Sequence, residues 1–359
     1  MPKFIPGLQL SRMFFEQEVK PILHIHFPNL KYSAALIGWG SEVLGYDTDQ
    51  STDHHWGPRV LLFLNESDYE YKRPIAQKLS DMLPLVFKGY STNFSKAEKN
   101  GVRHMVYKKS GKVNHMVDIF TFQSFFKMRL GIDASKTLTT ADWLTMPQDR
   151  LLETTSGDVF HDDLGFKKII STLKYYPHDV WSYLLASQWA KISEEEAFVG
   201  RTGVVGDELG SQVVAARLVR EIMRLCFLME KKYIAYSKWF GTAFKQLRSA
   251  KYFSPILHKV LLSKNWKERE RYLSRAYSKI AKMHNDLKIT KPLPTKPTKY
   301  YGRPYLVIHS DIFSAKIREK IINKKIKNLK LIGSVDQFTD STPVSENIAL
   351  AKKLIIIYS

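Results

Sequence analysis

The feature that most constrains the fold is a glycine-serine turn that precedes an acid, two histidines and a long apolar run. In order, these are Gly40-Ser41, then Asp53-His54-His55, then Val-Leu-Leu-Phe-Leu at residues 60–64. The apolar run predicts a buried β-strand. Because side chains alternate along an extended chain, Asp53 and His55 are expected to share one face, with His54 on the other. The segment therefore predicts a sheet with polar side chains where a strand begins.

Helical and extended patterns alternate around this segment. Apolar residues recur at helical spacing over residues 11–28, where Pro21 is a potential kink and Phe27-Pro28 ends the pattern. The next elements expected are a short apolar stretch at 34–37, the strand at 60–64, a helix at 74–83 and a strand at 113–122 that carries Asp118. This alternation over residues 30–130 predicts a small mixed sheet with helices on one side.

The pattern changes near residue 135. Long helical periodicities follow at residues 180–193, 211–231, 243–249 and 266–287. Four prolines between residues 289 and 304 exclude a helix there and indicate a linker or strap. A strand is expected at 305–309 and a basic helix at 315–326. We therefore expect an α+β protein: a mixed-sheet domain (1–135), a helical domain that closes a cleft (136–288), and a Pro/Lys-rich strap with a basic segment (289–359).

The single cysteine and the overall composition narrow the class of protein. Cys226 lies in an apolar helical run, so it is expected in the core, and it can form neither an internal disulfide nor a metal-thiolate cluster. No stretch has the roughly 18 uncharged apolar residues of a membrane span, and the N-terminus lacks a secretory pattern. We expect a cytoplasmic protein without a membrane partner.

Positive charge is concentrated in the C-terminal third. The net charge is +20; residues 1–150 carry 19 Lys and Arg against 15 Asp and Glu, whereas residues 241–330 carry 23 against 5. A nucleic-acid partner for residues 241–330 is one explanation, and a lysine-rich solvated surface is the alternative. On a continuous helix Lys316, Lys320 and Lys324 would form one stripe. A cationic substrate of the aminoglycoside type is disfavoured by this surface.

The order of motifs resembles the active site of the nucleotidyltransferase superfamily, which includes DNA polymerase beta and the antibiotic adenylyltransferases. There a Gly-Ser turn opens a helix, and a D-x-D pair follows about a dozen residues later. The resemblance implies that Gly40 and Ser41 approach the triphosphate of an NTP, with ATP expected. It also implies that Asp53, His55 and Asp118 hold Mg²⁺.

His55 stands where the superfamily has its second acid. Imidazole is a softer ligand than carboxylate, so Mn²⁺, or a direct contact of His55 with phosphate, is an alternative to Mg²⁺. Asp47 and Asp49 form a second D-x-D that remains an alternative ligand pair. Asp118 interrupts an apolar strand, where a carboxylate must be compensated, either by a cation such as the metal or by Arg103 or Lys112.

Several segments over nearly the whole chain resemble the family called domain of unknown function 4037. They begin at Gly40, Ser51, Tyr175, Glu195, Gly206, Ser237, Asp336 and Asp340. The family joins a nucleotidyltransferase-like domain to a helical part, and the resemblance implies the same division here. Candidate nucleotide contacts are then Arg59, Arg201 in a glycine-rich loop, Lys238 and Trp239. An acid of the helical part that activates the acceptor hydroxyl would be Glu196, Asp207 or Asp179.

These observations predict a metal-dependent nucleotidyltransferase. It would transfer a nucleoside monophosphate from an NTP to a hydroxyl of an unknown small molecule or RNA. Two alternatives stay open: a catalytically silent nucleotide-binding sensor, and an RNA-binding or toxin-like enzyme that modifies tRNA ends. The convergence of three metal-facing side chains would separate the transferase from the sensor.

Overall fold

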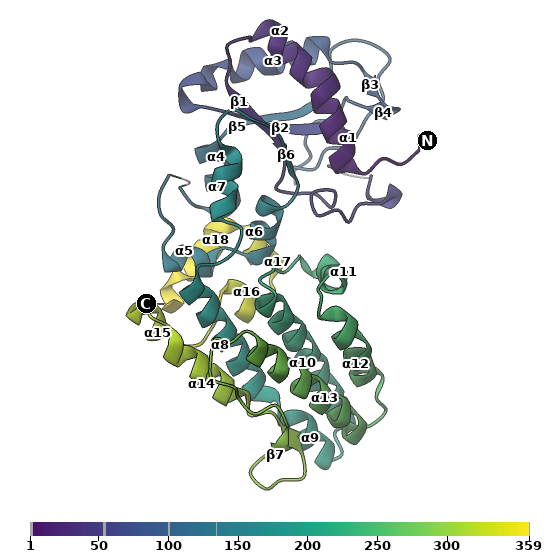
Figure 1. The fold of residues 1–359 in the computed structure, drawn as a ribbon. Helices are drawn as coiled ribbons and strands as arrows, with labels where there is room; N and C mark the ends of the chain where they lie inside the picture. Colours follow the sequence, from purple (N-terminus) through teal and green to yellow (C-terminus); the bar gives the residue numbers. More distant parts are fainter. Residues whose placement is uncertain (1–2, 53–54, 100, 134, 359) are drawn as a thin grey trace. The chain divides into compact units, whose positions relative to one another are not determined.

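Contacts within the chain define two units, which we describe separately (Figure 1). The first comprises Met1–Leu138 and Arg150–Lys174, and the second comprises Thr139–Asp149 and Tyr175–Ser359. The structure, a computed structural model, describes residues 3–52, 55–99, 101–133 and 135–358. Residues 289–359 thus belong to the same unit as the preceding long helices.

A four-stranded mixed sheet organises the first unit. Its strands are β1 (Tyr32–Leu36), β2 (Arg59–Leu64), β5 (Met116–Thr121) and β6 (Asp158–Asp162), in the order β5-β2-β1-β6. β1 is antiparallel to β2 and β6, and β2 is parallel to β5. The register aligns Ala35, Leu61 and Asp118 across three strands. The predicted mixed sheet is confirmed, while β6 was not predicted.

Helices cover both faces of this sheet. On one face, Val60, Leu62 and Val117 pack with Leu10, Phe14, Ile75 and Leu79 from α1 (Gly7–Phe14) and α3 (Lys72–Met82). A π-helical turn (Phe15–Val19) joins α1 to α2 (Lys20–His26), so the predicted N-terminal helix is present and Pro21 lies in the first turn of α2.

On the other face, the ring of Phe63 packs against those of Phe166 and Phe125, with centroids 4.2 and 5.3 Å away. Phe125 and Phe166 belong to α4 (Phe122–Leu130) and α7 (Phe166–Thr172). The expectation of helices on one side only is therefore wrong, because the aromatic side chains of β2 and β5 also bury the second face. The hairpin β3 (Val86–Phe87) and β4 (Tyr90–Ser91) completes this unit.

The second unit is built from helices. Its longer helices are α8 (His178–Glu195), α10 (Glu208–Met229), α12 (Ala250–Leu262), α13 (Trp266–Asp286) and α14 (Ser310–Lys320). α10 packs against α8, α12 and α13, and α14 packs against α8. Cys226 is fully buried in α10, as expected for a core residue. With the sheet of the first unit, these helices confirm the α+β class.

Short helices connect and extend this unit. They are α5 (Thr140–Thr145), α6 (Gln148–Thr155, which continues into the first unit), α9 (Phe198–Val204), α11 (Phe240–Lys245), α15 (Lys324–Lys327), α16 (Val335–Phe338), α17 (Thr342–Glu346) and α18 (Ile348–Lys353). The proline-rich segment contains no helix and ends in the pair β7 (Thr298–Lys299) and β8 (Leu306–Val307). No helix within the described ranges is long and apolar enough to cross a membrane.

Two local predictions are wrong. The glycine-rich stretch after Phe198 is not a loop at its start, because Gly200 and Gly203 lie inside α9, where they face Tyr305 and Trp266. The predicted helix at 315–326 is two helices: α14 ends at Lys320, with Ile321 extended, and α15 begins at Lys324. Lys316, Lys320 and Lys324 therefore do not form one helical stripe.

Candidate functional site

Strand directions gather the predicted site segments at one edge of the sheet. β1 ends at Leu36 and leads into the Gly-Ser turn, and β2, antiparallel to β1, begins at Arg59 beside that end. β5 runs parallel to β2, so its first half, with Asp118 paired to Leu61, lies at the same edge. Three segments that are far apart in sequence are therefore neighbours here.

The Gly40-Ser41 segment is a series of tight turns rather than the start of a helix. Gly38 and Gly40 have φ of 90° and 121°, which favour glycine. The N–H groups of Leu44 and Tyr46 donate to the Ser41 carbonyl at 3.2 and 2.9 Å. No hydrogen bond engages the hydroxyl or the N–H of Ser41 among the described residues. The expected turn is present, but the helix expected to follow it is not.

A buried ion pair supports this turn. Arg59 donates from Nε to Glu42 Oε1 at 2.7 Å and also donates to the carbonyl of Trp39, and both residues are 2% exposed. Burial raises the pKa of Glu42, and the charge of Arg59 opposes that rise. Arg59 was expected to contact nucleotide; in this structure its guanidinium holds the turn instead.

Asp47 has a structural role, because its carboxylate binds donors from other parts of the protein. Its Oδ2 accepts hydrogen bonds from the N–H of Gly7 at 2.7 Å and from Trp56 Nε1 at 2.9 Å. These bonds join the first turn of α1 to the loop before β2. Asp47 is therefore occupied by protein donors, and the alternative Asp47-x-Asp49 pair gains no support from the contacts.

His55 and Asp118 are both neighbours of Arg103. The His55 N–H donates to the Arg103 carbonyl at 2.9 Å, and Asp118 is near enough to oppose the burial that lowers the pKa of Arg103. Asp118 is partly exposed. Asp53 lies outside the described residues, and within the described part of the chain no three His, Cys, Asp or Glu side chains form a metal-binding group. The predicted Asp53, His55 and Asp118 metal site thus stays a prediction.

The acids predicted to activate the acceptor each accept backbone N–H groups. Glu196 accepts from Ile308 and Ser310 at 2.9 and 3.0 Å, Asp207 from Gly210 at 2.7 Å, and Asp179 from Ile322 and Asn323 at 3.2 and 2.7 Å. Glu196 and Asp207 hold the N-terminal turns of α14 and α10. These contacts give each of the three acids a structural role. Their catalytic role stays a prediction.

Two predicted groups of nucleotide contacts lie at opposite ends of α10. Arg201 is in α9, before α10 begins, while Lys238 and Trp239 form a 3-10 turn after it ends. α10 has 22 residues, which corresponds to about 33 Å. Arg201 and Lys238 are exposed, and Lys238 Nζ lies 5.0 Å from the Trp239 ring. The structure does not bring these two groups into one cleft wall.

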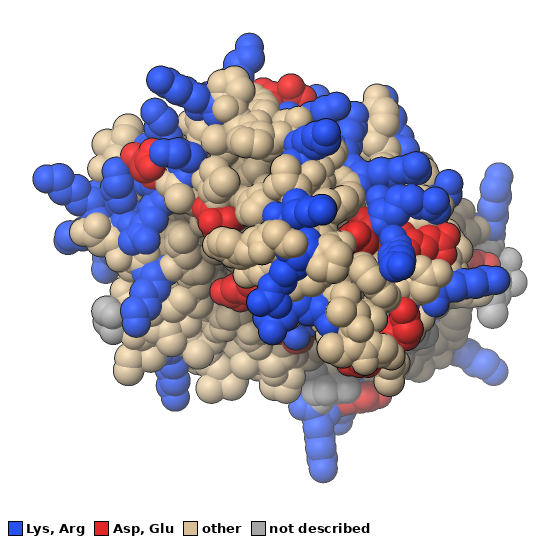
Figure 2. Space-filling model, turned by 90° about the horizontal axis from the view of Figure 1, so that it is seen from below, with Lys and Arg blue, Asp and Glu red and all other residues tan. Residues whose placement is uncertain are grey.

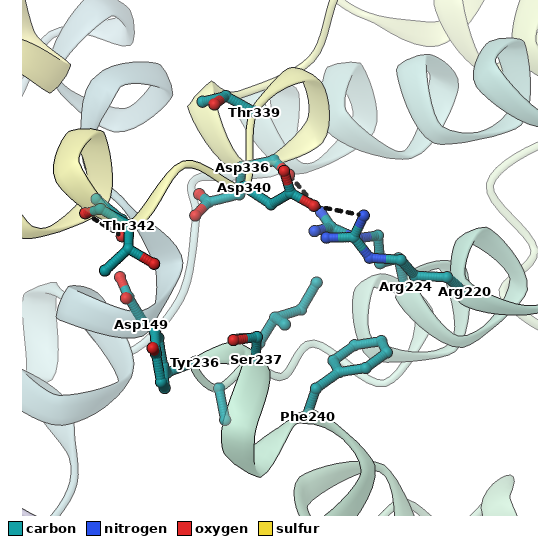
Figure 3. A pocket seen from close by; sticks show the side chains of 13 residues that line it. Asp149, Arg220, Arg224, Tyr236, Ser237, Phe240, Asp336, Thr339, Asp340 and Thr342 are labelled. Atoms are coloured by element: carbon teal, nitrogen blue, oxygen red, sulfur yellow. Dashed lines mark hydrogen bonds and ion pairs between the residues drawn. The ribbon is translucent and has the colours of Figure 1, made fainter. Parts of the chain in front are cut away.

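A pocket that sequence reasoning missed lies within the second unit (Figure 3). Its volume is about 360 Å³. Ten labelled residues line it: Asp149, Arg220, Arg224, Tyr236, Ser237, Phe240, Asp336, Thr339, Asp340 and Thr342. They come from α6, α10, the segment leading into α11, and the segment around α16 and α17. Three carboxylates, two guanidinium groups and several hydroxyls therefore surround one cavity.

Ion pairs and burial set the charge in this pocket. Arg220 Nη1 lies 2.9 Å from Asp340 Oδ2, and Arg224 donates to the Asp336 carbonyl. The Asp336 carboxylate accepts the Gln148 N–H at 3.0 Å. Burial, reinforced by the charge of Asp149, raises the pKa of Asp336 to about 7. Burial lowers the pKa of Arg224, whose Nε has no hydrogen-bond partner among the described residues.

The two arginines of the pocket could have been recognised from the sequence. Arg220 and Arg224 are one helical turn apart in a stretch that is otherwise rich in apolar residues. Arg224 is only 6% exposed, which is rare for arginine and usually indicates a specific polar environment. The partners Asp336 and Asp340 could not be paired with them from sequence alone.

Comparisons with known proteins add a family for part of the chain. No curated protein matches significantly. A crystal structure of a nucleotidyltransferase-like protein from Exiguobacterium sibiricum 255-15 matches 80% of this chain and 83% of its own, at 11% identity and a TM-score of 0.33. The fold assignment therefore rests on the sheet and helices described above. The family described as domain of unknown function (DUF4037) matches residues 143–240, so the predicted resemblance to this family is confirmed over that segment. The matched segment includes the pocket residues Asp149, Arg220, Arg224 and Tyr236.

Proposed function

We propose that the first unit transfers a nucleoside monophosphate from an NTP to an acceptor hydroxyl. One observation carries the proposal: the turn after β1, the start of β2 and Asp118 of β5 lie at one edge of the sheet. Separate strands thus supply a phosphate-binding turn and a carboxylate to a common place. Nucleotidyl transfer depends mainly on such positioning and on compensation of charge at the phosphate.

The proposal gives a role to each residue of this group. Ser41 has a hydroxyl and an N–H that other described residues leave free to donate to phosphate oxygens. The Glu42–Arg59 pair holds the turn from beneath. Asp118, with Asp53 and His55, offers the oxygen and imidazole ligands that suit Mg²⁺ or Mn²⁺. A divalent ion held there would offset negative charge on the phosphates.

The pocket of the second unit is proposed to bind a polar ligand of its own. Its carboxylates accept hydrogen bonds from hydroxyl or ammonium groups, and Tyr236 and Phe240 offer aromatic surface. Asp336, with a pKa near 7, is suited to exchange a proton near neutral pH. We therefore expect a polar ligand in this pocket, recognised by Asp336 and Thr342.

A silent nucleotide-binding protein is the second candidate. It is favoured by one observation: Arg59 is paired with Glu42 inside the protein rather than being free to contact a nucleotide. Such a protein would bind NTP at the Ser41 turn without turnover. Binding and transfer must therefore be measured on the same preparation.

The test uses the whole chain with each α-labelled NTP, Mg²⁺ or Mn²⁺, and a cell extract of small molecules and RNA. Asp118→Asn is expected to lower label transfer at least about 100-fold, because one metal ligand is lost. Ser41→Ala is expected to weaken NTP binding about tenfold. Asp81→Asn, an exposed acid of α3 in the same unit, is the matched control and should change neither.

The outcomes separate the candidates. Transfer that survives Asp118→Asn at the control rate would overturn the assignment of Asp118. NTP binding that depends on Ser41, with no transfer in any extract, would replace the transferase by the sensor. Asp336→Asn should lower the retention of polar molecules from the extract and leave NTP binding unchanged; unchanged retention would remove Asp336 from ligand binding.

A further inference from the structure

One surface of the second unit is rich in cations. α12 (Ala250–Leu262) and α13 (Trp266–Asp286) lie side by side. Residues 250–262 and 271–285 contain six Lys and Arg and no Asp or Glu. Four of the six, Arg271, Arg275, Lys279 and Lys282, are spaced by three or four residues and so lie on one side of α13.

A groove beside α13 concentrates these charges. Its volume is about 470 Å³, and its lining residues are Ile256, Ser274, Arg275, Ser278, Lys279, Lys282, Lys296, Pro297 and Leu306. Four cations and two hydroxyls thus face one groove, and no carboxylate lines it in the described part of the chain. The hydroxyl of Ser274 is buried and makes no hydrogen bond there.

The groove cations are unpaired among the described residues, unlike some exposed cations elsewhere in this unit. Lys316 is paired with Glu319 at 2.8 Å, and Arg217 with Glu195 at 2.6 Å. In contrast, Arg275, Lys279, Lys282 and Lys296 form no ion pair with any described residue. Like charges gathered in a concave surface repel one another, and an anion placed among them relieves that repulsion.

Two tyrosines stand among the cations. Tyr252 is 50% exposed, with the Nζ atoms of Lys251 and Lys279 at 4.9 and 4.3 Å from its ring centre. Tyr272 has Lys259, Arg271 and Arg275 at 5.7, 4.7 and 5.5 Å from its ring. Cations that follow a backbone, together with aromatic rings on which bases stack, are the combination used by proteins that bind single-stranded nucleic acid.

General positive charge does not distinguish the groove. Figure 2 shows Lys and Arg side chains spread over the face that it views, with Asp and Glu between them. What sets the groove apart is that, among the described residues, four cations and no carboxylate line it, and that two tyrosine rings lie beside those cations. A flat basic face would suit binding to a membrane surface, whereas a groove suits binding of a single nucleic-acid strand.

We propose that the groove lined by Arg275, Lys279, Lys282 and Lys296 binds the phosphate backbone of a single-stranded RNA, with Tyr252 and Tyr272 beside the bases. This interaction goes beyond nucleotidyl transfer and does not depend on it. The expected ligand is polyanionic and the contact is electrostatic, so binding has to weaken steeply with salt.

The test measures fluorescence anisotropy of a labelled single-stranded RNA with the full chain between low and physiological salt. Arg275→Glu/Lys279→Glu is expected to weaken binding at least tenfold and to reduce the slope of log K against log salt by about 1.4, or about 0.7 for each lost contact. Lys316→Glu/Lys320→Glu makes the same change in net charge on α14 and should weaken binding less than about twofold. Thermal unfolding confirms that each variant folds.

Several results would overturn the proposal. One is the absence of RNA binding even at low salt. A second is equal weakening by the α14 control, which would mean that only net charge acts. A third is anionic phospholipid vesicles that bind through Arg275 and Lys279 while RNA does not. Asp118→Asn should bind RNA as the wild type does, so failure of the transferase proposal leaves this test intact.

Discussion

The two units stabilise buried carboxylates in different ways. In the first unit Glu42 is paired with an opposite charge, Arg59, at 2.6 Å. In the second unit Glu196, 6% exposed, has no cation beside it among the described residues and accepts two backbone N–H groups and the hydroxyl of Ser310. An ion pair offsets burial by charge, whereas N–H donors offset it by dipoles. Burial raises the pKa of both carboxyls, that of Glu196 to about 7, and the partners of each oppose the rise.

The two units also use glycine for different structural purposes. Gly40 of the first unit has φ of 121°, a backbone conformation that other residues rarely adopt. Gly200 and Gly203 of the second unit are helical, and a Cβ on either would collide with Tyr305 or Trp266. The first glycine allows a turn, and the other two allow close packing of a helix. Similar glycine-rich sequences thus serve different physical needs.

The largest effect is expected for the charge pair of the first unit. Arg59→Ala should lower the free energy of unfolding by about 3–5 kcal/mol, because Glu42 remains buried without its partner. Glu42→Met/Arg59→Leu should cost much less, since no isolated charge remains. Chemical denaturation measures both. If Arg59→Ala costs no more than the double variant, the contrast with Glu196 is lost.

A pH-dependent effect of about 3 kcal/mol is expected for Glu196. Its pKa is about 7 in the folded protein and 4.5 in the unfolded chain, so the folded state binds more protons between these values. Its contribution to stability is therefore full below pH 4.5 and is lost as pH rises through 7. Glu196→Gln should remove that fall. Denaturation at pH 5 and pH 8 measures it, and an equal pH dependence in variant and wild type would contradict the prediction.

The smallest expected effect sharpens the comparison of glycines. Gly203→Ala should cost about 1–3 kcal/mol, because the added methyl group overpacks the contact of α9 with Trp266. Gly241→Ala is the matched control: Gly241 is also helical, but no atom lies within 4 Å of the position that an alanine methyl group would occupy. That change should be neutral or stabilise the protein by up to about 1 kcal/mol. Equal effects at both positions would show that helix propensity, not packing, matters.

Periodic apolar patterns predicted the regular elements best. β2 and β5 and the helices α8, α10 and α13 lie close to their predicted ranges, because each buries a side or a face that is visible as periodicity. β6 (Asp158–Asp162) was missed, since three of its five residues are polar and all five are only partly buried. α12 was missed; it contains Pro255 in its interior.

For the candidate sites too, features encoded locally in the sequence were predicted, and features that depend on distant contacts were not. The turn at Gly40-Ser41 and the strand position of Asp118 were recognisable because the residues that matter are close in sequence or interrupt a regular pattern. The burial of Arg59 with Glu42 was not, because pairing across 17 residues depends on how β2 meets the turn. The glycine-rich stretch was misinterpreted because glycine marks both loops and close helix contacts.

The sequence by itself determined the α+β class, the single core cysteine, the excess of positive charge in the C-terminal third and the resemblance to the family that matches residues 143–240. All of these follow from local pattern and composition. Only the tertiary structure decided that Asp149, Arg224 and Asp336 line one pocket, and that the cations of α13 and Lys296 line one groove. These groups are joined by helix packing between distant segments, and packing depends on the shape of whole surfaces rather than on any short run of residues.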